Sequence, residues 1–253
     1  QRRELLWQIV AREVKARYKQ SILGYFWVIL NPLAQMLVMS FAFSIILRIP
    51  TNAAAHIPYS IFLFTALLPW TLFTNSLSSA SASLVNSSNL ITKIYFPRTI
   101  LVVSTIFAKI IDFVFAISIL VIYMIIYQIP ITWNILWVIP IFLIQQIFTL
   151  GLSLFFAAAN LLYRDIQYLL NMILLLWMYA TPIVYPMSQI PERWQWLYAL
   201  NPMSSVIEIF RFAFLGSGSV NLQHLAISVG MTIFIFGLGI VLFSRIEKTF
   251  MDT

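Results

Sequence analysis

Few side chains in this sequence could act on a bound molecule, so their spacing carries most of the chemical information. Lys109 and Asp112 stand three residues apart inside a long apolar stretch, and Glu208 and Arg211 repeat that spacing later in the chain. Residues three apart share one face of a helix, so each pair can bring opposite charges together. We expect a mutually neutralising structural role for the first pair, with conformational coupling as the alternative. The second pair should hold a short helix in place, unless it is an inert pair at the membrane surface.

Other kinds of chemistry lack the residues they require. The chain has no cysteine and only two histidines, His56 and His224, which are far apart in the sequence, so we predict no metal site. No group of carboxylates suits acid–base catalysis, and we propose no catalytic residue and no enzymatic activity. The motif Gly-x-x-x-x-Gly-Lys-Ser/Thr is absent, so the chain should hold no nucleotide or other cofactor of its own.

Composition places the chain in a membrane. Of its 253 residues 61% are hydrophobic and only 9% are charged, which is too few charges to cover a globule in water. The net charge of +7 does not indicate nucleic-acid binding, because so few charges cannot line a basic face outside the N-terminal arm. Charge-free runs long enough for at least one membrane span cover residues 20–47, 49–92, 113–163, 166–191 and 212–244.

We therefore predict an all-α integral membrane protein that forms a single domain over residues 1–253. A basic amphipathic helix at 1–20 should lie in the membrane interface, unless it is a solvated arm that only orients the first span. The Asn31-Pro32 dipeptide is expected to form an elbow before the first span. Half of the residues in the stretch 76–89 are serine, which predicts a loop or a short surface helix. Six spans are expected at 32–49, 59–80, 99–127, 135–161, 168–184 and 225–243.

The segment 187–216, between the fifth and sixth spans, has a different character. It interleaves prolines and charges with aromatic residues, and after Pro202 only about 13 residues remain before Gly216. A helix of that length covers roughly 20 Å, whereas the hydrocarbon core is about 30 Å thick. We predict two short re-entrant helices, which enter the membrane and return to the same side.

Positive charge predicts the orientation. With six spans, the flanks on the side of the N-terminus hold eleven of the fifteen Lys and Arg residues, and the opposite flanks hold three. Because basic flanks stay in the cytoplasm, both termini are expected to be cytoplasmic in a multi-pass protein of a bacterial inner (plasma) membrane.

Several short motifs occur in the order found in one family. The run Tyr18-Lys19-Gln20-Ser21-Ile22-Leu23-Gly24-Tyr25-Phe26-Trp27 leads into Leu30-Asn31-Pro32-Leu33, and Phe96-Pro97-Arg98, Tyr163-Arg164-Asp165 and Leu200-Asn201-Pro202-Met203 follow. Ile207-Glu208, Phe210-Arg211 and the C-terminal residues Phe243, Glu247, Phe250 and Asp252 fit as well. Together they resemble ABC-2 type permeases that export polysaccharide. Within that family the chain looks most like the membrane subunit that exports lipid-linked O-antigen, with teichoic-acid and capsule exporters close to it.

The resemblance implies partners and assigns roles to residues. It implies a homodimer of this chain, bound to two ATPase subunits that hold ATP and Mg, which moves a lipid-linked glycan to the outer side of the membrane. It also implies that the N-terminal helix and the segment after span two touch the ATPase, and that the short helices before span six form an outer gate. The coupling residues would then be Arg12, Lys15, Ser83, Asn86, Asn89, Lys93 and Arg98, and the gate residues Glu192, Asn201, Pro202, Glu208 and Arg211.

Aromatic residues make up 16% of the chain and allow two interpretations. Most should belong to ordinary belts at the two membrane interfaces. A glycan conduit would also use aromatic rings, because the apolar faces of sugars stack on them. Candidates for such a conduit are Trp27, Trp70, Phe73, Trp177, Tyr179 and Tyr185. A small-molecule or drug exporter of the same family, and a stand-alone secondary transporter, remain as alternative functions.

Overall fold

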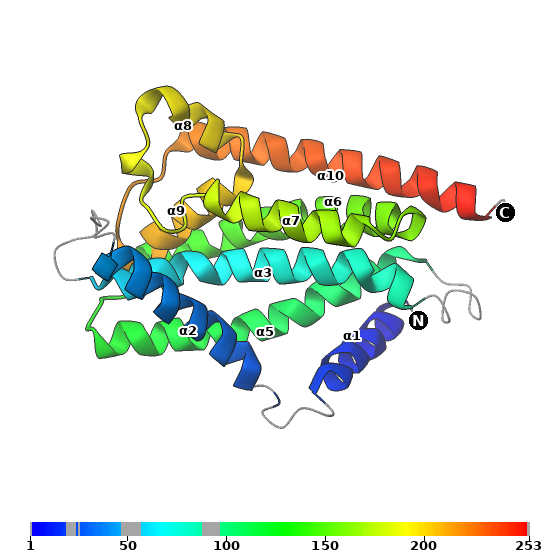
Figure 1. The fold of residues 1–253 in the computed structure, drawn as a ribbon, viewed down its shortest axis with the longest axis horizontal. Coiled ribbons are helices and arrows are strands. Elements are labelled where there is room, and N and C mark those ends of the chain that lie inside the picture. Colours follow the sequence, from blue (N-terminus) through cyan, green and yellow to red (C-terminus); the bar gives the residue numbers. More distant parts are fainter. Residues whose placement is uncertain (1, 19–23, 25, 47–56, 88–96, 252–253) are drawn as a thin grey trace.

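The computed structural model describes residues 2–18, 24, 26–46, 57–87 and 97–251, and every regular element within these segments is a helix (Figure 1). The elements are α1 (Arg2–Tyr18), α2 (Phe26–Ser40) with a π-helical extension (Phe41–Ile46), α3 (Tyr59–Asn86), α5 (Thr99–Ile126), α6 (Val138–Leu162) after a 3-10 turn (Trp133–Trp137), α7 (Ile166–Tyr179), a 3-10 turn (Met187–Gln189), α8 (Glu192–Ala199), α9 (Pro202–Leu215) and α10 (Leu222–Met251).

Five of these helical segments are long and apolar enough to cross a membrane. They are Phe26–Ser44, Tyr59–Asn86, Thr99–Ile126, Trp133–Leu162 and Leu222–Glu247. The predicted all-helical membrane architecture is thus confirmed. The apolar helix α7 occupies the position of the predicted fifth span, but it has only 14 residues.

Helix α3 forms the centre of the bundle, and it corrects one prediction. The stretch from Ser76 onward is not a loop, because α3 continues through it to Asn86. Ser76, Ser81 and Ser83 are buried. The hydroxyl of Ser83 donates to the carbonyl of Ala80, 2.7 Å away, so the helix itself satisfies this donor. Small side chains also let neighbouring helices approach closely, which explains why a serine-rich sequence suits a buried membrane helix.

The start of the first span differs from the predicted elbow. Helix α2 begins at Phe26, runs through Asn31 and keeps Pro32 buried inside it. A proline removes one backbone donor from the helix, and neighbouring helices commonly compensate for this loss in membrane proteins. The first apolar helix is therefore one continuous element up to its π-helical end.

Helices α6 and α10 touch at the level of their backbones. A Cβ atom built on Gly239 of α10 would lie 2.8 Å from the carbonyl carbon of Gly151 on α6, and still closer to its oxygen. A Cβ atom built on Gly151 would lie 2.6 Å from the Cα of Phe236. Only glycine fits at this crossing, which is a common way for membrane helices to pack.

Different elements lie at the two ends of the bundle. In Figure 1, α1, the last turns of α3 and the end of α10 lie toward the right-hand end. The short helix α8 lies at the other end, beside the start of α10. Ile9 of α1 is buried in a cluster with Leu101 and Val102 of α5, and Val10 is buried as well, so α1 packs against the bundle.

Candidate functional site

A polar cleft lies among α2, α3 and α5, with a volume of about 440 Å³. It brings together two sets of residues that the sequence analysis treated separately: the charged pair Lys109 and Asp112, and the aromatic candidates Trp27 and Trp70. Each helix contributes residues from one face. The cleft thus combines charge and aromatic surface between helices that are otherwise apolar.

Further polar side chains complete the wall of this cleft. Asn31 and Gln35 come from α2, and Thr71, Thr74 and Asn75 from α3. The hydroxyls of Thr71 and Thr74 donate to the carbonyls of Leu68 and Trp70, at 3.0 and 3.1 Å, so their oxygens keep acceptor capacity. Amide, hydroxyl and charged groups beside tryptophan rings form a surface suited to a ligand with many hydroxyl groups.

The sequence analysis missed these five polar residues, although the sequence contains a signal for them. Asn31 and Gln35 are four residues apart, and Thr71, Thr74 and Asn75 follow at helical spacing. Polar residues that repeat on one face of a membrane helix indicate a face that lipid does not cover. None of the five is ionisable, so the pattern of charges alone does not reveal them.

The remaining aromatic candidates lie elsewhere. Phe73 is fully buried, and its ring centroid lies 5.5 Å from that of Phe148 and 5.4 Å from that of Trp177. Phe73 and Trp177 therefore pack against other rings and do not line the cleft, and their place in a conduit stays a prediction. Tyr179 is exposed and Tyr185 half-buried, both beyond the cleft. The rings of Phe73, Phe148 and Trp177, which come from α3, α6 and α7, pack against one another.

A second polar arrangement surrounds the connection between α7 and α8. Arg211 of α9 is buried and donates to the carbonyls of Pro182, at 2.7 Å, and of Ile183. Its guanidinium also lies 3.6 Å from the centre of the Phe62 ring. Tyr59 of α3 donates to the next carbonyl along this connection, that of Val184, at 2.7 Å. The residues 182–184 are thus held by α3 and α9 through their backbone carbonyls.

This arrangement corrects the predicted pair of Glu208 with Arg211. Both residues border one pocket of about 390 Å³ and influence each other electrostatically, but among the described residues no ion pair within 4.0 Å joins them. The guanidinium points to carbonyls instead, because the connection after α7 has no helix of its own to satisfy them.

The other gate residues have local roles that the structure makes clear. Asn201 precedes α9, and its side-chain oxygen accepts from the backbone N–H of Met203 at 3.1 Å. Its amide group donates to the hydroxyl of Thr181 at 3.0 Å. With Pro202 in the first position of α9, the pair forms a typical helix start. Glu192 is exposed in the first turn of α8.

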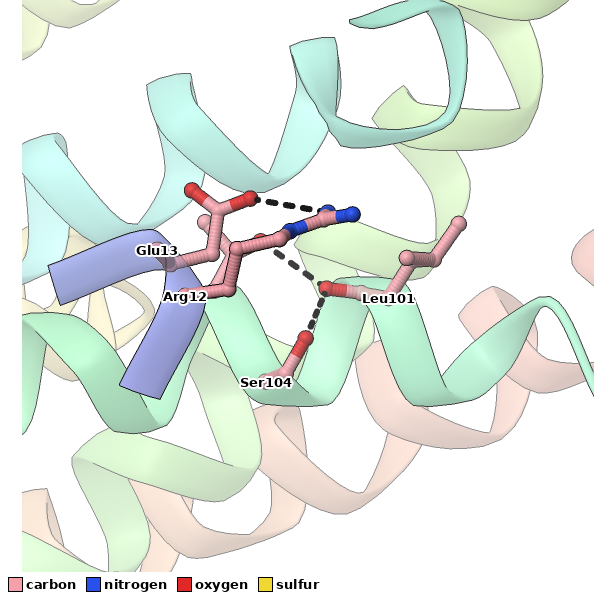
Figure 2. A network of polar contacts seen from close by, with 5 residues as sticks. Arg12, Glu13, Leu101 and Ser104 are labelled. Atoms are coloured by element: carbon pink, nitrogen blue, oxygen red, sulfur yellow. Dashed lines mark hydrogen bonds and ion pairs between the residues drawn. The ribbon is translucent and has the colours of Figure 1, made fainter. Parts of the chain in front are cut away.

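The predicted coupling residues that the structure describes lie near one end of the bundle. Figure 2 shows Arg12 of α1, 3.5 Å from the carboxylate of Glu13, beside the turn of α5 that carries Leu101 and Ser104. Arg12 and Lys15 are exposed, Asn86 is the exposed last residue of α3, and Arg98 directly precedes α5. Ser83 is buried, and its hydroxyl donates to the carbonyl of Ala80. Asn89 and Lys93 lie outside the described residues.

The sequence is similar to that of a known family of membrane proteins and to several of its members. Residues 4–215 match the family described as ABC-2 type transporter. The chain is 31% identical to an O-antigen export system permease protein, RfbA, of Klebsiella pneumoniae over 98% of this chain and 94% of that protein. It is 35% identical to the protein of the same name in Myxococcus xanthus, over 85% of this chain and 81% of that protein. A polysialic acid transport protein, KpsM, of Escherichia coli is 26% identical over 96% and 93% of the two chains.

The matched region begins within α1 and reaches the last residue of α9. It therefore contains the cleft and also residues 182–184, whose carbonyls Arg211 binds. The chain belongs to the ABC-2 type transporter family of membrane proteins.

Proposed function

We propose that this chain is the membrane permease subunit of an ATP-driven exporter that moves lipid-linked polysaccharide from the cytoplasmic to the outer side of the membrane. One observation carries this conclusion: permeases named for O-antigen export are 31–35% identical to the chain over most of its length. The similarity to a polysialic acid transport protein supports the same class of substrate.

The cleft among α2, α3 and α5 is our candidate for the first contact with the glycan. Its amide and hydroxyl groups can exchange hydrogen bonds with sugar hydroxyls, while Trp27 and Trp70 offer faces for stacking. Lys109 and Asp112 supply one charge of each sign in the same wall. Ionisable side chains inside a membrane typically face such a cavity and mark the route of a substrate.

We further propose six crossings with both termini in the cytoplasm. Support comes from α7, which runs beside α3 and returns the chain toward the end where α8 lies (Figure 1). The excess of basic residues in the flanks on the side of the N-terminus supports the orientation. Helix α8 has only 8 residues and lies at the end of the bundle beside the start of α10, which supports a re-entrant gate on the outer side.

Two ATPase subunits and a second copy of the chain complete the proposed transporter. The exposed basic residues of α1, together with Asn86 and Arg98, lie at the end that this orientation places in the cytoplasm. We propose that an ATPase docks there, and that ATP and Mg bind to that partner. Because α1 packs on α5, which lines the cleft, movement of α1 can be transmitted to Lys109 and Asp112.

A photo-crosslinking amino acid at Lys15 tests this arrangement in intact membranes. We expect it to capture a second polypeptide that binds an ATP analogue, because Lys15 is exposed on α1. The matched control is Trp133, which is 87% exposed between α5 and α6, at the other end of α5. Capture of the ATPase from position 133 instead would contradict the proposed orientation, because it would place the other end of α5 in the cytoplasm. Capture from neither position, with proton-driven transport by the purified chain alone, would favour a secondary transporter.

A further inference from the structure

A third pocket, distinct from the cleft, lies at helix α8. It has a volume of about 460 Å³, within the range of small-molecule sites. We name it the α8 pocket; its walls include Tyr185, Gln189, Pro191, Trp194, Leu197 and Tyr198. Of these residues, only Tyr185 was a candidate on sequence grounds.

Two tyrosines fix the direction of hydrogen bonding in the α8 pocket. The hydroxyl of Tyr185 lies 3.1 Å from the backbone carbonyl of Tyr179 and 3.0 Å from the hydroxyl of Tyr198. A carbonyl can only accept, so the single hydrogen of Tyr185 goes to it, and Tyr198 must donate its own hydrogen to Tyr185. Burial raises the pKa of Tyr185, which keeps its hydroxyl protonated. The oxygen of Tyr198 therefore remains able to accept a hydrogen bond.

The opposite wall of the α8 pocket is apolar and aromatic. Trp194 is 48% exposed and Leu197 46% exposed, and Pro191 lies beside them. The guanidinium of Arg193 stands 5.7 Å from the centre of the Trp194 ring, which orders that ring on one side. The pocket thus offers a flat apolar surface together with an oriented acceptor.

We propose that the α8 pocket is a binding subsite for one sugar ring of the glycan. A pyranose has an apolar face of C–H groups that stacks on an aromatic ring, and hydroxyls at its edge that can donate to the oxygen of Tyr198. An acyl chain would use the apolar wall but leave that acceptor without a donor. The proposal rests on the proposed function, since the polymer in transit supplies the sugar.

Binding of oligosaccharide fragments tests the subsite. The fragments are released by mild acid from the cell's own lipid-linked polysaccharide, and their dissociation constant is measured on the purified permease–ATPase assembly in lipid nanodiscs. Trp194→Leu and Tyr198→Phe should each weaken binding about five- to tenfold, through loss of the stacking surface and of the acceptor respectively. Trp196→Leu is the matched control, because Trp196 is 57% exposed on the same helix but does not line the pocket.

Unchanged binding by both pocket variants would overturn the subsite, as would equal weakening by Trp196→Leu, which would indicate an anchor in the membrane interface. Wild-type assemblies that export polysaccharide yet bind no fragment would also overturn it, while leaving the proposed function intact. Assemblies that hydrolyse ATP but export no polysaccharide would contradict the proposed function itself.

Discussion

Replacement of Gly239 by alanine is expected to lower the stability of the protein by about 3 kcal/mol, because the new methyl group would collide with the backbone of α6. The obstacle is the carbonyl of Gly151, a backbone group that no change of rotamer can move. Helices α6 and α10 would have to separate at their crossing, and their packing would be lost along the contact. The apparent Tm of the purified protein should fall by roughly 10 °C.

Two other glycines of α10 provide controls for Gly239→Ala. A Cβ atom at Gly230 or Gly237 would meet no heavy atom within 4 Å. Since alanine is the better helix former by about 1 kcal/mol, Gly230→Ala and Gly237→Ala should leave the Tm unchanged or raise it slightly. Equal effects at all three positions would mean that the close crossing of α6 and α10 does not exist in the membrane.

Replacement of Arg211 by methionine should lower the free energy of unfolding by about 3–5 kcal/mol, and it should abolish export. Methionine keeps much of the side-chain volume but leaves the carbonyls of Pro182 and Ile183 buried without their donor. The connection between α7 and α8 would lose its attachment to α9. We expect little folded permease in the membrane, measured as the monodisperse fraction after detergent extraction.

The acidic neighbour distinguishes this explanation from a simple ion pair. If Arg211 served mainly to neutralise Glu208, then Glu208→Gln would rescue Arg211→Met. Because the arginine donates to carbonyls, we expect the double variant to be no more stable than Arg211→Met alone. Glu208→Gln alone should cost less than about 1 kcal/mol, since Glu208 makes no ion pair within 4.0 Å among the described residues. A clear rescue in the double variant would restore the ion-pair interpretation.

Much of the helical arrangement could be predicted from the sequence, because a segment that crosses the lipid must be apolar, helical and long enough to span it. The starts of α3 and α5, at Tyr59 and Thr99, agree with the predicted starts of spans two and three. The two short helices on either side of Asn201-Pro202 were also predicted, since the segment mixes prolines and charges with aromatic residues and the length after Pro202 is too short for a span. These features depend on local sequence and on the thickness of the membrane.

The interior of the bundle was harder to predict, because it depends on which helix lies beside which. Serine at position 81 is unfavourable against lipid but suitable beside α6, where its hydroxyl donates to the backbone carbonyl of Phe156 at 3.4 Å. Arg211 was paired with the nearest acidic residue in the sequence, whereas its partners are carbonyls about thirty residues away along the chain. The cleft needed three helices to be placed together before its polar residues formed one surface.

Transport of glycan into sealed inverted membrane vesicles tests the central claim most directly. The vesicles contain the chain with its ATPase, and lipid-linked polysaccharide is supplied on the outer surface, which is the former cytoplasmic face. We predict that ATP, but not a non-hydrolysable analogue, moves the glycan into the lumen, where an added glycosidase cannot degrade it. Vesicles in which the assembled complex hydrolyses ATP while the glycan stays fully accessible to the glycosidase would contradict the assignment of polysaccharide as the substrate.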